Sequence, residues 1–92
     1  MIESFRHKGL KRFFEDDVGR KLPADMLERI RSILTLLDAA KVIKDMDRPT
    51  LGLHPLKGDL KGFWAVTVRA NWRIIFRFDE AKAYDVDFLD YH

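Results

Sequence analysis

The chain of 92 residues contains no cysteine. Disulfide bonds and thiolate metal sites are therefore excluded as means of holding it together, and a reducing compartment suits it. No apolar run approaches the roughly 18 residues of a membrane-spanning helix. The charged start, Met1 to Lys11, is not followed by the apolar core of a signal peptide. We therefore expect a cytoplasmic protein that does not contact a membrane.

Length and composition indicate a single domain. About half of the residues are hydrophobic (47%) and about a third are charged (35%), which is typical of a globular chain. The sequence has no internal repeat, low-complexity segment or linker. We expect residues 1–92 to form one domain with a two-layer core.

Charge is distributed unevenly in the second half of the chain. Between His54 and Arg77, five basic residues accompany one acid, and between Phe78 and His92, five acids accompany one lysine. On neighbouring strands, this segregation produces either an anion-binding face edged by acids or cross-strand salt bridges. Composition alone does not choose between the two.

The most informative stretch runs from Gly62 to Phe78, where apolar residues alternate with other types on both sides of a short break at Asn71. This alternation predicts a β-hairpin. A two-residue loop would mix charge into the apolar row, so we predict a three-residue loop, Ala70–Trp72. The apolar pairs of that register are Val68 with Ile74, Val66 with Phe76, and Trp64 with Phe78.

The predicted register gives the hairpin two different sides, one apolar and one cationic. We expect the apolar side to face the core, together with Trp64 and Trp72, and the cationic side to carry the function. The residues predicted on the cationic side are Thr67, Arg69, Arg73 and Arg77.

Two helices are predicted before the hairpin. Residues 8–16 place apolar side chains at helical spacing and precede Gly19, which we expect to end the first helix. Residues 23–40 begin with Pro23 and repeat apolar residues every three or four positions. Arg29 and Arg31 fall outside the apolar stripe, so we expect them to be solvated.

Three further strands complete the predicted sheet. We expect residues 1–5 and 53–56 to form short edge strands, the second limited by Pro55. A final strand follows the turn at residues 79–81, with Phe76 paired to Tyr84 and Ile74 to Val86. The predicted fold is α+β, with two N-terminal helices packed on one face of a four- to five-stranded, mainly antiparallel, twisted sheet.

Two histidines of the second half are candidates for chemistry. His54 enters the sheet and His92 follows Asp90 and Tyr91. Because imidazole titrates near neutrality, two such groups near a cationic face suggest general acid–base catalysis on a phosphate ester. Two alternatives stay open: His54 packs in a turn, and His92 is frayed and inert. His7 is expected to begin the first helix.

Other chemistries lack support in the sequence. Gly58 and Gly62 match no phosphate-binding loop, and the few hydroxyl residues lie far from both histidines. Asp85 and Asp87 are expected opposite arginines, which favours ion pairs over a metal site. We therefore expect neither a metal nor a cofactor.

Several fragments together resemble the HigB branch of the RelE superfamily of bacterial toxins. Each fragment is weakly specific by itself, but their order and spacing form a specific combination. The resemblance implies a RelE-like fold and a ribosome-dependent endoribonuclease that cuts messenger RNA in the decoding site. The fragments are Leu53-His54-Pro55-Leu56-Lys57-Gly58-Asp59, Gly62-Phe63-Trp64, Asn71-Trp72-Arg73-Ile74 and Asp90-Tyr91-His92.

The resemblance also implies which residues act. The implied catalytic residues are His54, Asp90, Tyr91 and His92, and the implied cationic supports are Lys57 and Arg73. From the predicted cationic side we add Arg69 and Arg77 as phosphate-binding candidates, with pairing to Asp85 and its neighbouring acids as the equal alternative.

The partners implied by the resemblance are a helix-turn-helix antitoxin of the HigA type and a ribosome carrying messenger RNA, including its 16S RNA. DNA would be contacted only through the antitoxin. Two alternative functions use the same predicted fold. One is a non-catalytic RNA-binding module, and the other is a protein-binding inhibitor like the ParE relatives that target gyrase.

Overall fold

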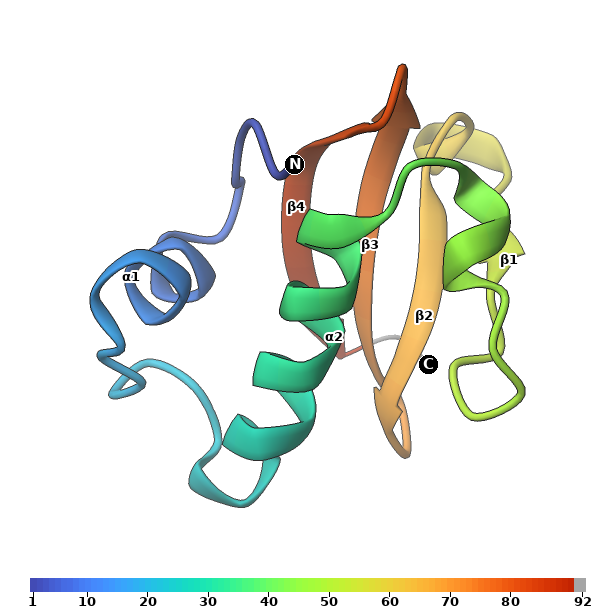
Figure 1. The fold of residues 1–92 in the computed structure, drawn as a ribbon. Coiled ribbons are helices and arrows are strands. Elements are labelled where there is room, and N and C mark those ends of the chain that lie inside the picture. Colours follow the sequence, from blue (N-terminus) through green and yellow to red (C-terminus); the bar gives the residue numbers. More distant parts are fainter. Residues whose placement is uncertain (91–92) are drawn as a thin grey trace.

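A four-stranded antiparallel sheet and two α-helices make up the computed structural model, which describes residues 1–90 (Figure 1). The strands follow one another across the sheet in chain order, β1-β2-β3-β4. The elements are α1 (Lys8–Asp16), α2 (Leu27–Ala39), β1 (His54–Pro55), β2 (Trp64–Arg69), β3 (Trp72–Asp79) and β4 (Lys82–Asp90). Short 3-10 helices occur at Ala24–Met26, Ile43–Met46 and Gly58–Leu60. The predicted α+β architecture of two helices on an antiparallel sheet is confirmed.

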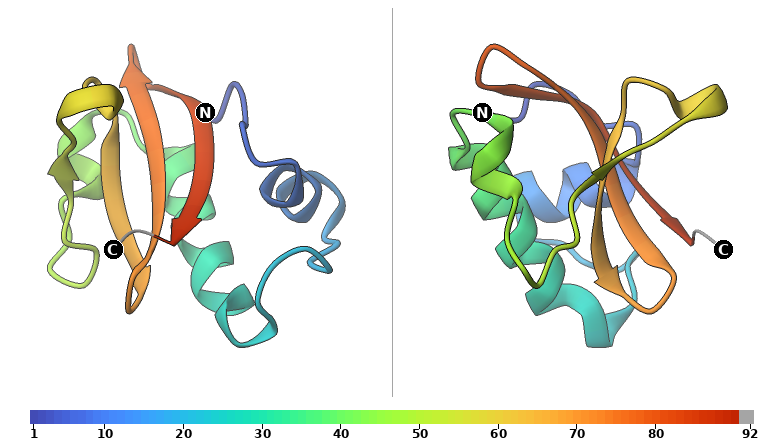
Figure 2. Two further views of the ribbon diagram at one scale, coloured as in Figure 1. Left: turned by 180° about the vertical axis from the view of Figure 1, so that it is seen from behind. Right: turned by 90° about the vertical axis from the view of Figure 1, so that its right-hand side faces the viewer.

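The two faces of the sheet differ in what covers them. α2 lies across one face, and α1 lies beside it towards β4 (Figure 1). The main core fills the space between these helices and the sheet, and it includes the partly buried Trp64 and Trp72, as predicted. The opposite face, seen from behind in Figure 2, is covered by neither helix. We call it the open face.

α1 has the predicted bounds but ends for a different reason. The Nδ1 atom of His7 accepts a hydrogen bond from the backbone N–H of Leu10 at 3.1 Å, so His7 caps the start of the helix as expected. The helix stops at Asp17, whose N–H donates to the carbonyl of Phe13 at 3.0 Å and whose left-handed backbone (φ +58°) lets the N–H of Val18 donate to the carbonyl of Arg12 at 3.5 Å. Gly19, the predicted stop, lies two residues further on.

The hairpin of β2 and β3 uses a shorter turn than predicted. Two residues, Ala70–Asn71, connect the strands, and Val68 forms a bulge in β2. The extra residue brings the apolar rows of both strands back onto one face, which a plain two-residue turn would not do. The predicted three-residue loop is therefore wrong, and the partners differ by two positions, although the apolar rows of both strands face the main core as predicted. The observed pairs include Val66 with Ile74 and Trp64 with Phe76.

The predicted register between β3 and β4 is also wrong. A second bulge lies in β4, at Asp85 and Val86, and Asp85 adopts a left-handed conformation there (φ +53°). The bulge shifts the pairing, and an alternation pattern does not reveal it. The observed pairs include Ile74 with Phe88 and Phe78 with Ala83.

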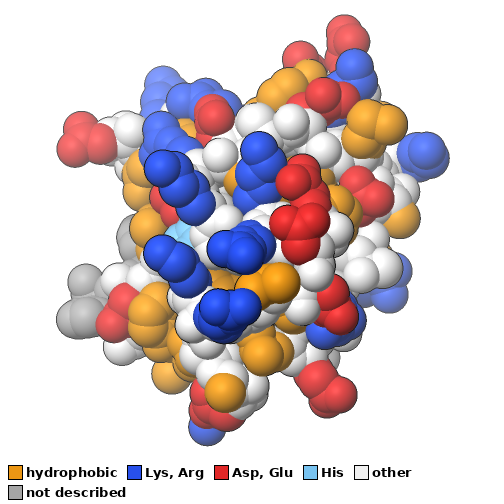
Figure 3. Space-filling view, turned by 90° about the vertical axis from the view of Figure 1, so that its left-hand side faces the viewer, with side chains coloured by type: hydrophobic (Ala, Val, Ile, Leu, Met, Phe, Trp, Pro, Cys, Tyr) orange, Lys and Arg blue, Asp and Glu red, His pale blue; other side chains and the backbone are white. Residues whose placement is uncertain are grey.

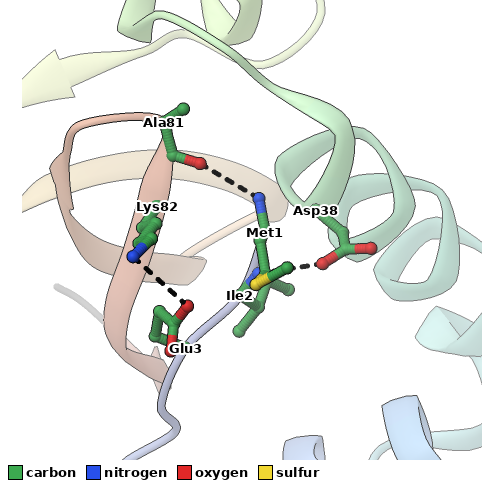
Figure 4. A network of polar contacts seen from close by, with 6 residues as sticks. All are labelled: Met1, Ile2, Glu3, Asp38, Ala81 and Lys82. Atoms are coloured by element: carbon green, nitrogen blue, oxygen red, sulfur yellow. Dashed lines mark hydrogen bonds and ion pairs between the residues drawn. The ribbon is translucent and has the colours of Figure 1, made fainter.

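The first residues of the chain lie along β4 but do not form the predicted edge strand. Ile2 and Phe5 form isolated parallel bridges to Ala83 and Val86. Figure 4 shows how the segment is fixed: the N-terminal nitrogen donates to the carbonyl of Ala81, and the N–H of Ile2 donates to Asp38 at 2.8 Å. The segment therefore covers the outer edge of β4.

Arg29 of α2 is a structural residue and not the solvated one predicted. Its Nε atom donates to the carbonyl of Val68 at 3.2 Å, and its Nη2 atom donates to the carbonyls of Thr50 and Thr67 at 2.7 and 3.2 Å. Its side chain joins α2, the bulge of β2 and the loop before β1. Arg31 is exposed, as predicted, and pairs with Asp17 at 2.7 Å.

No helix among the described residues is long and apolar enough to cross a membrane.

We expect Arg29→Met to lower the free energy of unfolding by about 2 kcal/mol, because three carbonyls lose a charged donor. The matched control is Arg20→Met, since Arg20 is exposed and its side chain has no hydrogen bond or ion pair within residues 1–90. Urea denaturation of both variants measures the difference. Equal stability of the two variants would contradict a structural role for Arg29.

Candidate active site

The open face has an apolar floor surrounded by charged side chains. Phe63, Ala65 and Ile75 are at most 2% exposed and pack together with Leu56. The side predicted to be cationic therefore also carries a buried apolar cluster, which the prediction did not include. The small cluster forms because alternate positions of β2 and β3 also carry apolar residues, which the loop before β2 covers.

His54 stands on the edge strand β1 and belongs to the open face. It pairs with Ala65, which faces this side, and its side chain is exposed. Its Nδ1 atom lies 3.0 Å from the carbonyl oxygen of Gly52. A carbonyl oxygen accepts hydrogen bonds but cannot donate, so this contact requires the proton on Nδ1. In the neutral ring, Nε2 then carries the lone pair and can exchange a proton with a substrate.

Arg77 is held on the open face by three neighbours. Its guanidinium carbon lies 4.5 Å from the centre of the Phe63 ring, and its Nε atom lies 3.6 Å from a carboxylate oxygen of Asp85. Gly62 has positive φ (+96°), and a Cβ atom there would meet Nη1 of Arg77 at 2.9 Å. The guanidinium therefore occupies space that any other residue at position 62 would fill. Arg77 therefore lies on the predicted face, and it also forms the ion pair with Asp85 that was the alternative to phosphate binding.

Arg6 is a further cation of this face that sequence analysis missed. Its guanidinium carbon lies 5.1 Å from the centre of the same Phe63 ring. Phe5 packs against the main core, so the next residue points to the opposite side. The signal was present in the sequence, because extending the alternation of the predicted edge strand (residues 1–5) by one residue places Arg6 on the side opposite Phe5.

Arg73 and Lys57 lie at different parts of the open face. The Nη1 atom of Arg73 donates to the carbonyls of Ala70 and Trp72 at 2.6 and 3.2 Å, and its Nε atom is buried with no hydrogen-bond partner in the described part of the chain. Arg73 is therefore fixed near the β2–β3 turn. Lys57 is exposed in the loop that follows β1.

Arg69 does not lie on the open face, which corrects the prediction. The bulge at Val68 reverses the direction of the next side chain, so that Arg69 pairs with Trp72, a residue of the core side. Its guanidinium forms an ion pair with Asp25, just before α2. The structure therefore separates Arg69 from Arg73 and Arg77.

Asp90 is the last described residue and pairs with Trp72, a residue of the core side, so it lies on the same side of the sheet as Arg69 and not on the open face. His54 is on β1, so β2 and β3 separate the two, each strand spacing being about 4.8 Å. Tyr91 and His92 lie outside the described residues. The expected convergence of the two histidines therefore stays a prediction.

Within residues 1–90, no group of three or more histidine, cysteine, aspartate or glutamate side chains is arranged to hold a metal ion. The acids of the open face contact other groups. Asp85 pairs with Arg77, and the carboxylate of Asp87 accepts the N–H of Phe88 at 2.9 Å.

Comparison with protein families identifies one match. Residues 3–92 match the model of the HigB-like toxins, described as RelE-like toxins of the type II toxin–antitoxin system HigB. The chain is 49% identical over 92 residues to "Endoribonuclease HigB" of Proteus vulgaris, with both chains fully covered. It is 32% identical over 94 residues to "Toxin HigB-1" of Vibrio cholerae, covering all of this chain and 98% of that one.

Solved structures support the same fold. A YoeB dimer from Staphylococcus aureus superposes with a TM-score of 0.60 and 18% identity, covering 99% of this chain and 94% of that chain. A YoeB–YefM complex from the same organism gives a TM-score of 0.58 and 18% identity, with 100% and 95% coverage. At this level of identity the likeness concerns the fold alone.

We expect Gly62→Ala to displace the Arg77 guanidinium from the Phe63 ring, because the new methyl group would overlap with it. Gly58→Ala is the matched control. Gly58 also has positive φ (+65°), but a Cβ atom at this position would meet no neighbouring group within 4 Å. Both changes should cost about 1 kcal/mol of stability through backbone strain. Only Gly62→Ala should shift the Arg77 Nε–H NMR resonance, and an unchanged resonance would contradict the contact.

Proposed function

This chain belongs to the HigB-like family of RelE-like toxins of type II toxin–antitoxin systems, and on that premise we propose that it is an endoribonuclease that cuts messenger RNA in the decoding site of the ribosome. Cleavage proceeds by attack of a ribose 2′-hydroxyl on the adjacent phosphate, without a metal ion. The result is inhibition of translation.

The observation that carries this proposal is the state of His54. The carbonyl of Gly52 accepts from Nδ1, which fixes the orientation and the tautomer of the ring. The protonated ring can then donate from Nε2 to a leaving oxygen. An exposed histidine held in this way on a face with arginines is suited to proton transfer at a phosphate ester.

The reaction needs two proton transfers and positive charge on the phosphate. A base removes the 2′-hydroxyl proton as the bond between this oxygen and phosphorus forms, and an acid protonates the departing 5′-oxygen as its bond to phosphorus breaks. The products are a 2′,3′-cyclic phosphate and a 5′-hydroxyl. We assign the base to His92 and the acid, or an orienting role, to His54.

Cationic side chains stabilise the negative charge that develops on the nonbridging oxygens. Arg73 and Lys57 fill this role, and Arg73 is already oriented by the carbonyls of Ala70 and Trp72. Arg77 positions the backbone of the message. Asp90 positions a neighbouring histidine or tyrosine, and Tyr91 stacks on the displaced nucleotide.

The partners follow from the family. We propose that an antitoxin of the helix-turn-helix HigA type neutralises the chain, and that DNA is reached only through this antitoxin. The catalytic target is a ribosome carrying messenger RNA, with its 16S RNA around the site, so the protein acts in the cytoplasm. The fold relative YoeB is known in a complex with YefM, which is consistent with a protein partner for this fold.

We expect His54→Ala and His92→Ala each to lower the cleavage rate by about a hundredfold to ten thousandfold, because each removes a proton carrier. Binding to the ribosome should change little. The control is the third histidine: His7→Ala removes a helix cap and should cost about 1 kcal/mol of stability without loss of cleavage. Rates of cleavage on stalled ribosomes with a defined message provide the measurement, and wild-type rates in both variants would refute the site.

The second test changes the substrate. Replacing the 2′-hydroxyl at the scissile nucleotide by hydrogen should abolish cleavage there, since the attacking group is lost. Mapping of the product ends on the same message, with and without the replacement, gives the answer. Cleavage that persists at this nucleotide would mean that water or another nucleophile attacks the phosphate.

A further inference from the structure

A cationic cleft lies at α1, away from the open face. α1 and the segment that follows it enclose a volume of about 270 Å³. Four of its six lining residues are basic and none is acidic. The lining residues are Lys8, Gly9, Arg12, Val18, Arg20 and Lys21.

The four basic side chains of this α1 cleft are not neutralised by the protein. None of them forms an ion pair or a side-chain hydrogen bond with another residue in the range 1–90. The nearest acids along the chain are Glu15 and Asp16, three and four residues after Arg12, and neither forms an ion pair with it; Asp17 pairs with Arg31. Figure 3 shows lysine and arginine side chains gathered on this side of the molecule.

The local backbone brings these charges together. Lys8 and Arg12 are one helical turn apart and therefore share a face of α1. Gly9 lets the segment at Lys21 approach the helix, because a Cβ atom at position 9 would lie only 2.9 Å from the Cβ of Lys21. Close packing of residue 21 on α1 therefore sets where the backbone places these charges.

We propose that the α1 cleft binds the phosphodiester backbone of a structured RNA, as an anchor separate from the catalytic face. This inference rests on the proposed function, which supplies an RNA target. α1 lies on the β4 side of the sheet and His54 lies on β1, at the other edge (Figure 1). The cleft and His54 therefore lie at opposite edges of the sheet, and one molecule can contact RNA at both.

The chemistry of the cleft favours RNA over a protein partner. Protein interfaces are centred on buried aromatic and apolar side chains and are depleted in lysine. The exposed large apolar residues found in the described chain are Met1, Phe14 and Val42, and none of them lines the cleft. Phosphate contacts need only cations, and no aromatic side chain is present in the cleft for stacking on bases. The cleft should hence bind without regard to base sequence.

The test compares two variants with the same charge change. Lys8→Gln/Lys21→Gln removes two charges from the cleft, and Lys41→Gln/Lys44→Gln removes two charges from exposed lysines near the 3-10 helix Ile43–Met46. The probe is purified small ribosomal subunits without message, and the measurement is the dissociation constant over a range of salt concentrations.

We expect the cleft variant to bind small subunits about tenfold or more weakly than the wild type. The magnitude of the slope of log binding constant against log salt concentration should fall by about 1.5, because two phosphate contacts are lost. The control should stay within about twofold of the wild type. No change in the cleft variant, or an equal loss in the control, overturns the proposal. It is also overturned if subunit binding is unchanged while affinity for the antitoxin falls, since the cleft would then be a protein site.

The outcomes of this test and of the proposed function are separable. If the wild type cuts message but the cleft variant binds subunits normally, the α1 cleft inference fails and the nuclease stands. If the wild type binds subunits with the expected salt slope but cuts nothing, the nuclease fails and the cleft is retained.

Discussion

The arrangement of this molecule depends on the contact between the guanidinium of Arg29 and three backbone carbonyls. The Val68 bulge and the loop before β1 present these carbonyls to α2, and Arg29 satisfies all three. Without such a donor, the two partly buried carbonyls, those of Val68 and Thr67, would lose a hydrogen bond at a substantial energetic cost. Arg29 thereby sets the position of the helix relative to β2 and of the loop that leads into His54. A residue on the helical side thus determines the geometry of the open face.

The open face combines a rigid floor with cations that are held in place in different ways. Arg77 is fixed by a ring, a carboxylate and the absence of a side chain at Gly62, whereas Arg73 is fixed by carbonyls of the turn. Fixed charges need little reorganisation when a phosphate develops further negative charge, which is the main requirement for electrostatic catalysis. The apolar cluster around Phe63 and Ile75 does not reduce the cationic character of this face, because it supports the guanidinium groups from below.

The sequence allowed the architecture and the two faces of the hairpin to be predicted, because alternation of apolar residues reports directly on burial. It did not allow the register to be predicted. Val68 and Asp85 look like ordinary members of the alternation, and bulges depend on pairing across strands that no local pattern describes. The bulge at Val68 also explains the error at Arg69. His54 was named as a candidate because its residue type is informative, and it lies on the open face, whereas Arg6 was missed because the predicted edge strand was not extended by one residue. The relation of His54 to His92 stays a prediction.

Both margins of the sheet are protected against addition of a foreign strand. On one side β1 is two residues long and includes a proline, which has no N–H to offer. On the other side the N-terminal segment occupies hydrogen-bonding groups of β4, with the N–H of Glu3 donating to Ala83 and that of Arg6 to Val86. Proteins with long uncovered edges tend to polymerise through them. The protected edges of this sheet oppose aggregation at high concentration. Self-association or partner docking would therefore use side-chain surfaces and not the addition of a strand to the sheet.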